Sequence, residues 1–269
     1  MLRKVRRRAF RRIVRLLAHI TPRWPDVALR VCDLLAPVVF APLSRDRVRE
    51  IFPHIDDATM NELLAHGRRT AMRNFMLAES IRLYDYPALR KVCVPNEAMR
   101  TLRTPLILGT FHLGALPAIG AGLEILPANV LVVRSTPKVA NVHDNLIIEM
   151  TRGDEQHRAR LFHRGLQFLR EGKYVFLPLD PEESTRVAAP FRGRTMQLAR
   201  GPFAMSRITN TPILPLVARW NGRRIEFVIG DVIPAGEEDV TAAAAAAWLE
   251  RYLDEHPLDI SPRVLELTS

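Results

Sequence analysis

The chain has 269 residues, with 39 Lys and Arg against 29 Asp and Glu, which gives a formal net charge of +10 at pH 7. That length suits one α/β domain or two small ones, and a composition of 48% hydrophobic and 25% charged residues excludes a chain that is disordered throughout. The two cysteines, Cys32 and Cys93, are too few for a disulfide framework or a thiolate metal cage, so we expect a reducing compartment.

The positive charge is concentrated at the start of the chain. Residues 1–15 contain eight cations and no acid, so the other 254 residues carry a net charge of only +2. This distribution argues against a uniformly basic, nucleic-acid-binding body. The sequence has no run of about 18 apolar residues that could form a transmembrane helix. The arginines interleave with apolar residues instead of preceding them, which argues against a signal peptide.

Residues 1–22 are predicted to form a basic amphipathic helix. Its apolar positions recur at steps of three and four, and they are Phe10, Ile13, Leu16, Leu17 and Ile20. Such a helix suits an anionic membrane surface. The residues expected to contact that surface are Arg3, Lys4, Arg7, Arg8, Phe10 and Arg11. The alternatives are a helix packed on the core and a nucleic-acid arm, but we expect no nucleic acid partner because Phe10 is the one aromatic residue among the arginines.

The remainder, residues 23–269, is predicted to be a single domain. Residues 23–100 are predicted to be mainly helical, with a long helix over 57–83 whose N-cap is Asp57 or Thr59. Over residues 101–257 short apolar runs alternate with helical segments, which predicts an α/β sheet with helices on its faces. Strands are expected at 105–110, 130–133, 174–179, 213–217 and 225–229, and helices near 141–152, 156–171 and 196–208. A last helix runs through the alanines at 242–247 and ends before Pro257, and residues 258–269 are a tail.

One segment points to chemistry. No His or Cys spacing fits a zinc site, and no G-x-S-x-G elbow, P-loop or G-x-G-x-x-G fingerprint is present, so we expect neither a metal nor a cofactor. In contrast, His112 and Gly114 directly follow the apolar strand at 105–110. Ligands of α/β sheets bind at the carboxyl ends of strands, although a lone histidine at such a place also fits a purely structural hydrogen bond.

Several blocks follow the His112 strand in order along the chain. They are Val132-Val-Arg-Ser-Thr-Pro, Leu169-Arg-Glu-Gly-Lys-Tyr-Val-Phe-Leu-Pro-Leu-Asp, Ala189-Pro-Phe-Arg-Gly-Arg and Thr211-Pro-Ile-Leu-Pro. With Arg47–Phe52 before them and Trp248-Leu-Glu-Arg after them, the set resembles the bacterial lipid A late-acyltransferase family of lauroyl/myristoyl type, which is related to the mycobacterial phosphatidylinositol mannoside acyltransferases. The resemblance covers roughly residues 30–257.

The resemblance implies both a fold and a reaction. The fold would be an α/β sheet like that of the glycerol-3-phosphate and lysophospholipid acyltransferases, with a helical N-terminal part. The reaction would move a fatty acyl group from acyl-carrier protein or acyl-CoA to a hydroxyl or amine of a lipid or amphipathic acceptor. The implied location is the cytoplasmic face of the bacterial inner membrane, with the protein held there peripherally.

The resemblance also implies site residues. His112 matches the family's general base, Asp180 matches the aspartate after the third strand, and Arg134 and Arg152 match arginines that bind substrate. Backbone N–H groups near Gly114, or Arg152, are expected to stabilise the oxyanion.

The sequence departs from the family motif H-x4-D/E at one position. The acid that should follow His112 by five residues is replaced by Pro117, which has no side-chain oxygen to orient an imidazole. We expect Asp180 to take its place, because it also follows a strand end at the same crevice. The alternatives are Glu182, Glu183 and Glu124. A chain in which no acid replaces Pro117 would be a non-catalytic lipid- or acyl-binding member of the same fold.

Overall fold

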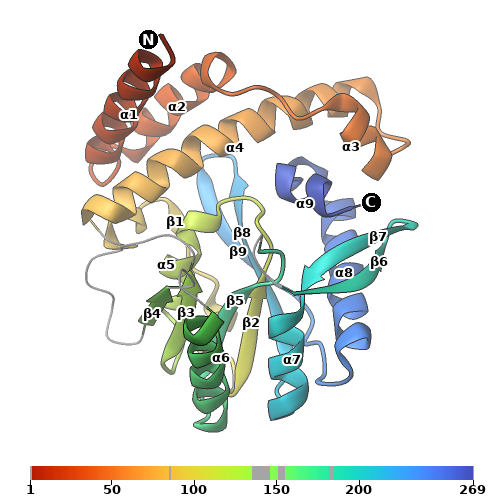
Figure 1. Ribbon diagram of the computed structural model, residues 1–269. Coiled ribbons are helices and arrows are strands. Elements are labelled where there is room, and N and C mark those ends of the chain that lie inside the picture. The colour runs from red at the N-terminus through yellow and green to blue at the C-terminus, as the bar shows by residue number, and fades with distance from the viewer. Residues whose placement is uncertain (1, 85, 135–145, 151–154, 182–184, 269) are drawn as a thin grey trace.

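The computed structural model describes residues 2–84, 86–134, 146–150, 155–181 and 185–268 (Figure 1). The first part of the chain is helical. It comprises α1 (Leu2–Ile20), α2 (Pro25–Val39), α3 (Arg45–Ile51), α4 (Asp57–Tyr84) and the 3-10 turns η1 (Tyr86–Leu89) and η2 (Glu97–Thr101). Pro25 suits the first turn of α2, where its fixed φ is helical and its missing N–H is not needed. The predicted cap of α4 is wrong by one residue, since Asp56 accepts from the backbone N–H and the hydroxyl of Thr59.

Within the described ranges, seven strands form one sheet in the order β1-β9-β8-β2-β5-β3-β4. They are β1 (Cys93–Val94), β2 (Leu106–Thr110), β3 (Val130–Arg134), β4 (Leu146–Met150), β5 (Tyr174–Pro178), β8 (Ile213–Asn221) and β9 (Arg224–Ile229). Every neighbouring pair is parallel except β8 and β9. Strands β6 (Arg186–Phe191) and β7 (Arg194–Ala199) form a separate antiparallel hairpin. The predicted α/β class, with a sheet flanked by helices and a helical N-terminal part, is confirmed.

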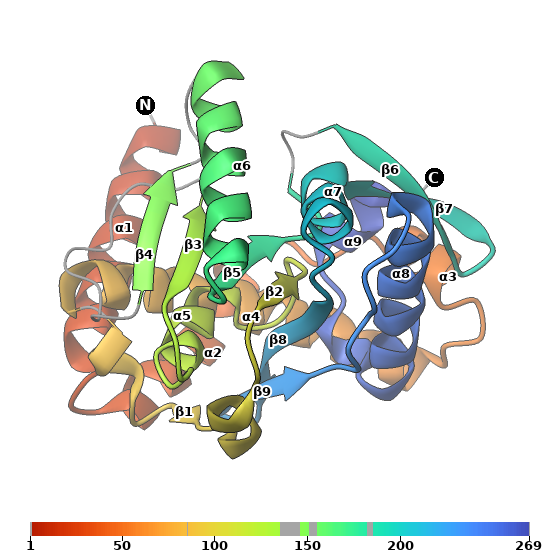
Figure 2. The ribbon, with the colours of Figure 1, turned by 90° about the horizontal axis from the view of Figure 1, so that it is seen from below.

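Helices cover both faces of the sheet (Figures 1 and 2). Successive strand residues point to opposite faces, so Ile107 belongs to one core while Leu106 and Leu108 belong to the other. The first core includes α3, α6 (Glu155–Arg170), α7 (Arg200–Thr209), α8 (Glu238–Glu255) and α9 (Pro262–Leu267). The second core includes α1, α2, η1 and α5 (Ile119–Leu123). Two further 3-10 turns are η3 (Leu116–Ala118) and η4 (Pro257–Asp259).

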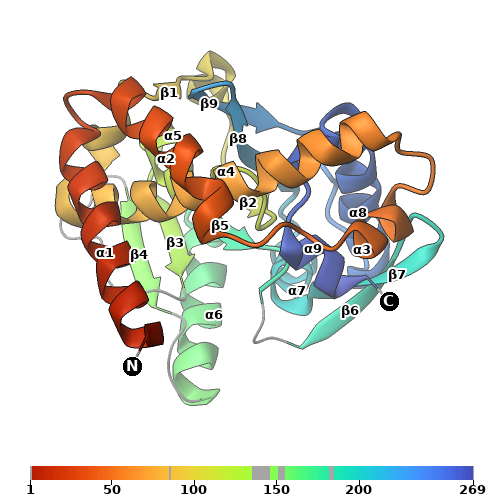
Figure 3. The same cartoon turned by 90° about the horizontal axis from the view of Figure 1, so that it is seen from above.

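Helix α4 joins the two cores. Met60 and Leu63 near its start are buried in the first core, and Met72 and Met76 near its end are buried in the second. The residues between them are only half-buried. A helix of 28 residues is about 42 Å long, so α4 reaches across the molecule from α9 to α1 (Figure 3). Its half-buried middle passes over the loop that follows β2.

Helix α1 packs against α2 and α4. Val14, Leu17 and Ala18 are buried in this contact, but Leu16 is 60% exposed and Ile13 is also exposed. The predicted apolar face is therefore divided between the core and the surface. Only the backbone is described for residues 2–9.

The structure corrects three predicted elements. Residues 146–150 of the helix expected near 141–152 form the strand β4 instead, because so short a segment has no periodicity that separates a strand from a buried helix. The helix expected at 196–208 begins only at Arg200, after the β6–β7 hairpin whose turn has positive φ at Arg192 and Gly193. The tail at 258–269 contains the helix α9, in which Val264, Leu265 and Leu267 are buried.

Candidate active site

The carboxyl ends of the two central strands β2 and β5 lie side by side. These strands pair in parallel from Leu106 with Tyr174 to Thr110 with Pro178. Just beyond the pairing, the N–H of Leu179 donates to the carbonyl of Thr110 at 2.7 Å, so the two backbone segments remain hydrogen-bonded as they leave the sheet. The next residues are Phe111 and His112 in the segment after β2, and Asp180 in the segment after β5. Parallel α/β sheets bind ligands at this edge.

His112 and Asp180 contact each other twice. The Nδ1 of His112 lies 2.7 Å from Oδ1 of Asp180, and the backbone N–H of His112 donates to Oδ2 at 2.9 Å. The Asp180 side chain is fully buried, whereas the His112 side chain is 38% exposed. An ionised carboxylate can only accept, so the proton lies on Nδ1 and the lone pair lies on Nε2. The arrangement presents a basic nitrogen that is oriented from behind by a buried acid.

The loop after His112 is held by α4 and β8. Asn74 in the middle of α4 donates from Nδ2 to the carbonyl of Gly114 at 2.6 Å, and the N–H of Ala115 donates to the carbonyl of Ala218 at 2.6 Å. Gly114 has φ +49, and a Cβ on it would lie 2.4 Å from the carbonyl oxygen of Ala218. Only glycine fits this close approach of two backbones. The sequence analysis missed Asn74, which is 40 residues from its partner.

The loop after β5 is held by the C-terminal helix. The Nε–H of Arg263 in α9 donates to the backbone carbonyl of Asp180 at 2.8 Å. This part of the chain was predicted to be a tail, so no role was predicted for Arg263. No local pattern signals it, because the two residues are 83 positions apart and meet only through the packing of α9.

A second buried carboxylate lies next to the site. Asp259 accepts from Nε of Arg219 at 3.1 Å and from the hydroxyl of Tyr252 at 2.6 Å, and Nε2 of His66 lies 3.6 Å from its other oxygen. Burial alone would raise the pKa of Asp259, but the contacts with His66 and Tyr252 and the charge of Arg219 outweigh burial and lower it. The α-carbon of Arg219 lies 3.0 Å from where a Cβ on Gly114 would be. This network therefore borders the His112 loop.

The other predicted site residues have different outcomes. Arg134 is the last residue of β3, at the same sheet edge, and only its backbone is described. Arg152, Glu182 and Glu183 lie outside the described residues. Glu124 lies at the end of α5, close enough to Cys93 for its charge to add to the burial that raises the pKa of that thiol to about 12. Of the two candidate acids that the structure describes, Asp180 and Glu124, Asp180 is the one that contacts His112.

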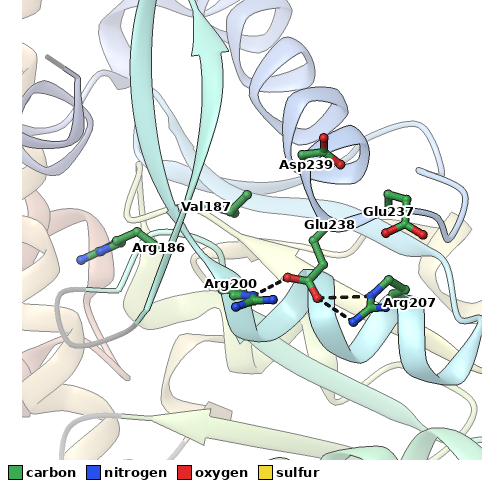
Figure 4. A pocket seen from close by; sticks show the side chains of 7 residues that line it. All are labelled: Arg186, Val187, Arg200, Arg207, Glu237, Glu238 and Asp239. Atoms are coloured by element: carbon green, nitrogen blue, oxygen red, sulfur yellow. Dashed lines mark hydrogen bonds and ion pairs between the residues drawn. The ribbon is translucent and has the colours of Figure 1, made fainter.

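Two hollows lie elsewhere on the described surface. The larger, of about 460 Å³, is bordered by β6, α7 and the start of α8 (Figure 4). There Glu238 pairs with both Arg200 and Arg207, so these charges compensate one another. The smaller, of about 250 Å³, lies between Phe52–Ile55 and the end of α8. Neither is lined by His112 or Asp180.

Neither a metal site nor a membrane-spanning helix is found among the described residues. No group of three or more His, Cys, Asp and Glu side chains is arranged to hold a metal ion there. In the same part of the chain, no helix has the length and apolar character needed to cross a membrane.

Comparison with known proteins finds a distant likeness of fold. No family model matches the chain, and no curated protein matches it. Among solved structures, the chain is similar to the crystal structure of the 1-acyl-sn-glycerophosphate (LPA) acyltransferase PlsC from Thermotoga maritima. The TM-score is 0.43 and the sequence identity is 13%, over 89% of this chain and 99% of that chain. A likeness of this size carries no argument about chemistry, so the functional assignment rests on the chain's own residues.

Proposed function

We propose that this chain is an acyltransferase in which His112 is the general base and Asp180 orients it. The single observation that carries the proposal is the 2.7 Å contact between Nδ1 of His112 and the fully buried carboxylate of Asp180, at the carboxyl ends of two parallel strands. Acyl transfer to an alcohol or amine needs such a base, because a neutral hydroxyl is a poor nucleophile near pH 7. The order of blocks that resembles the lipid A late-acyltransferases supports this class of reaction.

In the proposed step, Nε2 of His112 takes the proton of the acceptor hydroxyl while the acceptor oxygen attacks the thioester carbonyl carbon. The carbonyl oxygen becomes an oxyanion, for which backbone N–H groups near Gly114 and the side chain of Arg152 are the proposed donors. The tetrahedral intermediate then breaks its C–S bond. The departing thiolate takes the proton from the imidazolium, which leaves an ester, a free thiol and neutral His112.

Asp180 supplies what the family places at the position of Pro117. Asp180 fixes the imidazole by accepting from both Nδ1 and the backbone N–H of His112. The neighbouring negative charge also stabilises the imidazolium as it forms. Asp180, which follows a different strand, therefore takes the role that the family gives to the acid five residues after the histidine.

The proposed donor is acyl-carrier protein or acyl-CoA, and the proposed acceptor is a lipid or an amphipathic molecule. Both donors are acidic, so the excess of arginine favours their approach. Arg134, whose backbone ends β3 at this sheet edge, is proposed to bind substrate.

We further propose that the protein binds the cytoplasmic face of an anionic inner membrane through α1 and α2. Leu16, Leu34 and Val38 on these two helices, and Trp24 just before α2, are large apolar side chains that are more than half exposed. Among them lie the exposed cations Arg11, Arg12, Arg15, Arg23 and Arg30. Apolar side chains that enter the lipid and cations that meet its head groups are the two features of a peripheral membrane surface. The membrane contact of Arg3, Lys4, Arg7 and Arg8 is part of the same proposal. The ring of the predicted contact Phe10 is instead half-buried against the rings of Phe40 and Phe75.

The test is thiol release from acyl-CoA and acyl-carrier protein in the presence of vesicles made from a bacterial total lipid extract. We expect His112→Ala to lower the rate by at least about a thousandfold, as expected for loss of a general base that also depends on an orienting acid. The matched control is His163→Ala, because His163 lies on the exposed side of α6, and we expect its rate to be unchanged. If His112→Ala retains the full rate, the catalytic assignment is wrong. If the wild type binds acyl chains but never releases thiol, the chain is a non-catalytic acyl-binding protein.

A further inference from the structure

We propose that Arg263 is a positioning residue that sets the orientation of Asp180, and through it that of the His112 imidazole. The contact is the hydrogen bond from Nε–H of Arg263 to the backbone carbonyl of Asp180 at 2.8 Å. The catalytic consequence of this role rests on the function proposed above, whereas the positional role is a property of the fold alone.

The hydrogen bonds around Asp180 explain why one donor matters there. The N–H of Leu179 donates to Thr110 and the carbonyl of Leu179 accepts from Ala199, so the backbone just before Asp180 is held by its neighbours. Both carboxylate oxygens of Asp180 are engaged by His112. The remaining acceptor is the carbonyl of Asp180, and a buried carbonyl without a donor is costly. Arg263 supplies that donor and so fixes the peptide bond that follows Asp180.

Arg263 can fix this peptide because its own position is fixed. It lies in the first turn of α9, where the hydroxyl of Ser261 accepts from the N–H of Val264 at 3.4 Å. Val264 and Leu265 are buried in the core. The preceding residues are held by Asp259, which accepts from Arg219 of β8. A guanidinium on a helix anchored at both ends holds its partner more firmly than a side chain on a loop would.

The charge of Arg263 is also suited to the role. Its side chain is only 16% exposed, and Nη1 lies 3.3 Å from Oε2 of Glu266 on the surface. Nη2 is buried and has no hydrogen-bond partner among the described residues. A hydrogen bond from a charged donor is about twice as strong as one between neutral groups. Arg263 is therefore placed both to hold the backbone of Asp180 and to bring a positive charge beside the buried acid.

The experiment uses nuclear magnetic resonance of the isotope-labelled full chain and needs no turnover. Two signals report the orientation of Asp180: amide exchange of the His112 N–H, and the deshielded proton of the Nδ1–H···Oδ1 hydrogen bond. The variants are Arg263→Met, which keeps the length and apolar stem but cannot donate, and Arg263→Lys, which can donate. Glu266→Gln is the matched control because it removes the negative charge that faces Nη1 of Arg263. Asp180→Ala is the reference for complete loss, because it removes both acceptor oxygens.

We expect Arg263→Met to speed exchange of the His112 amide by about fivefold to tenfold and to weaken the Nδ1 proton signal. Exchange at Leu179 and Ala115 should not change, because their N–H groups donate to backbone carbonyls that Arg263 does not touch. Arg263→Lys should recover part of the protection, and Glu266→Gln should match the wild type.

Three results would overturn the proposal. The first is unchanged His112 exchange and an unchanged Nδ1 proton signal in Arg263→Met. The second is equal acceleration at His112, Leu179 and Ala115, which would make Arg263 a general stability residue. The third is an Asp180→Ala variant with wild-type signals, since Asp180 would then not orient His112 at all. If Arg263→Met does not fold, Arg263→Lys decides: it should speed exchange at His112 and not at Leu179 or Ala115, and equal acceleration at all three would refute the role. Absence of acyl transfer in every variant would refute the proposed function and leave these measurements as they are.

Discussion

Two regions of the molecule break the rule that charged side chains lie in solvent and large apolar side chains lie in the core. They are the edge of the sheet at His112 and the outer surface of α1 and α2, and they break it in opposite ways. At the sheet edge a charged side chain is buried, and Asp180 has both oxygens matched by His112. On the helices large apolar side chains are in solvent, with Leu34 76% exposed and Val38 85% exposed. Both arrangements lower stability unless a partner compensates. The partner of the first lies inside this chain, whereas the partner of the second has to come from outside it.

This difference separates two kinds of functional evidence. A buried matched pair can be assigned by its geometry, because both members are present. An exposed apolar surface can be assigned only through what binds it, which here is proposed to be a membrane. Three kinds of substitution should separate the two regions. They remove the buried partner of His112, the contact between α4 and α2, and the exposed apolar side chains of α2.

The largest effect is expected for Asp180→Asn. Asparagine keeps the shape of the side chain but cannot stabilise an imidazolium and can favour the wrong tautomer. We expect the rate of thiol release to fall by roughly 10³- to 10⁴-fold, as for the orienting acid of a serine protease. A kinetic assay beside the wild type measures this, with circular dichroism as the folding control. A loss below about tenfold in a folded variant would show that another group orients His112.

The next largest effect is a loss of stability expected for Arg73→Met, because Arg73 connects α4 with α2. Arg73 of α4 donates from Nε and Nη2 to both oxygens of Asp33 in α2, at 2.8 Å and 2.9 Å, and it is buried. Arg73→Met leaves Asp33 without this partner, and breaking a buried ion pair in this way costs about 3–5 kcal/mol. Urea unfolding measures the change. The matched control is Arg82→Met, which removes a surface pair with Glu79 and should cost less than about 1 kcal/mol.

A smaller, pH-dependent effect is expected for Asp259→Asn. The pKa of Asp259 in the folded state lies below its ordinary value of 3.8. Its contribution to stability is therefore fully present above that ordinary value and is lost as the pH falls through the lower folded value. We expect the variant to be less stable than the wild type by about 2 kcal/mol at pH 7. The difference should shrink as the pH falls below 3.8. Urea unfolding at a series of pH values checks this, and a difference that stays constant with pH would contradict it.

The smallest change in stability is expected for the exposed surface. Leu34→Ser with Val38→Ser removes two side chains that contact little of the protein, so the free energy of unfolding should change by no more than about 0.5 kcal/mol. Affinity for vesicles that contain phosphatidylglycerol should fall by at least about tenfold, because two apolar side chains no longer enter the lipid. Co-sedimentation measures this, with Val240→Ser on α8 as the exposed control. Unchanged binding would remove α2 from the membrane surface.

The strands around the site were predictable because each is a short apolar run bounded by turn residues. The runs at 105–110 and 174–179 correspond to β2 and β5, and their parallel pairing follows from the strand–helix alternation. Asp180 could be chosen over the other acids because it follows a strand end, as His112 does. The choice also depended on the family resemblance, in which Asp180 matches the aspartate after the third strand, and the rule that strands end at the same edge of a sheet agrees with it.

The residues that hold the site could not be predicted in the same way. Asn74 and Arg263 approach the site from helices that are 40 and 83 residues from their partners. Nothing in their own neighbourhood marks them, because a helical pattern specifies which face is apolar and not what the polar residues meet. Leu16 was assigned to the apolar face together with Leu17, and the structure separates them because α1 turns toward α4 on the side of Val14, Leu17 and Ala18.

Helix α4 has a consequence for how the molecule unfolds. Its start is embedded in one core and its end in the other, so neither side of the sheet can melt while α4 stays intact. The two cores should therefore lose structure in a single transition, with calorimetric and van't Hoff enthalpies that agree. A molecule that binds only the folded loop beside Gly114 will then protect the N-terminal helices from heat as much as it protects the sheet.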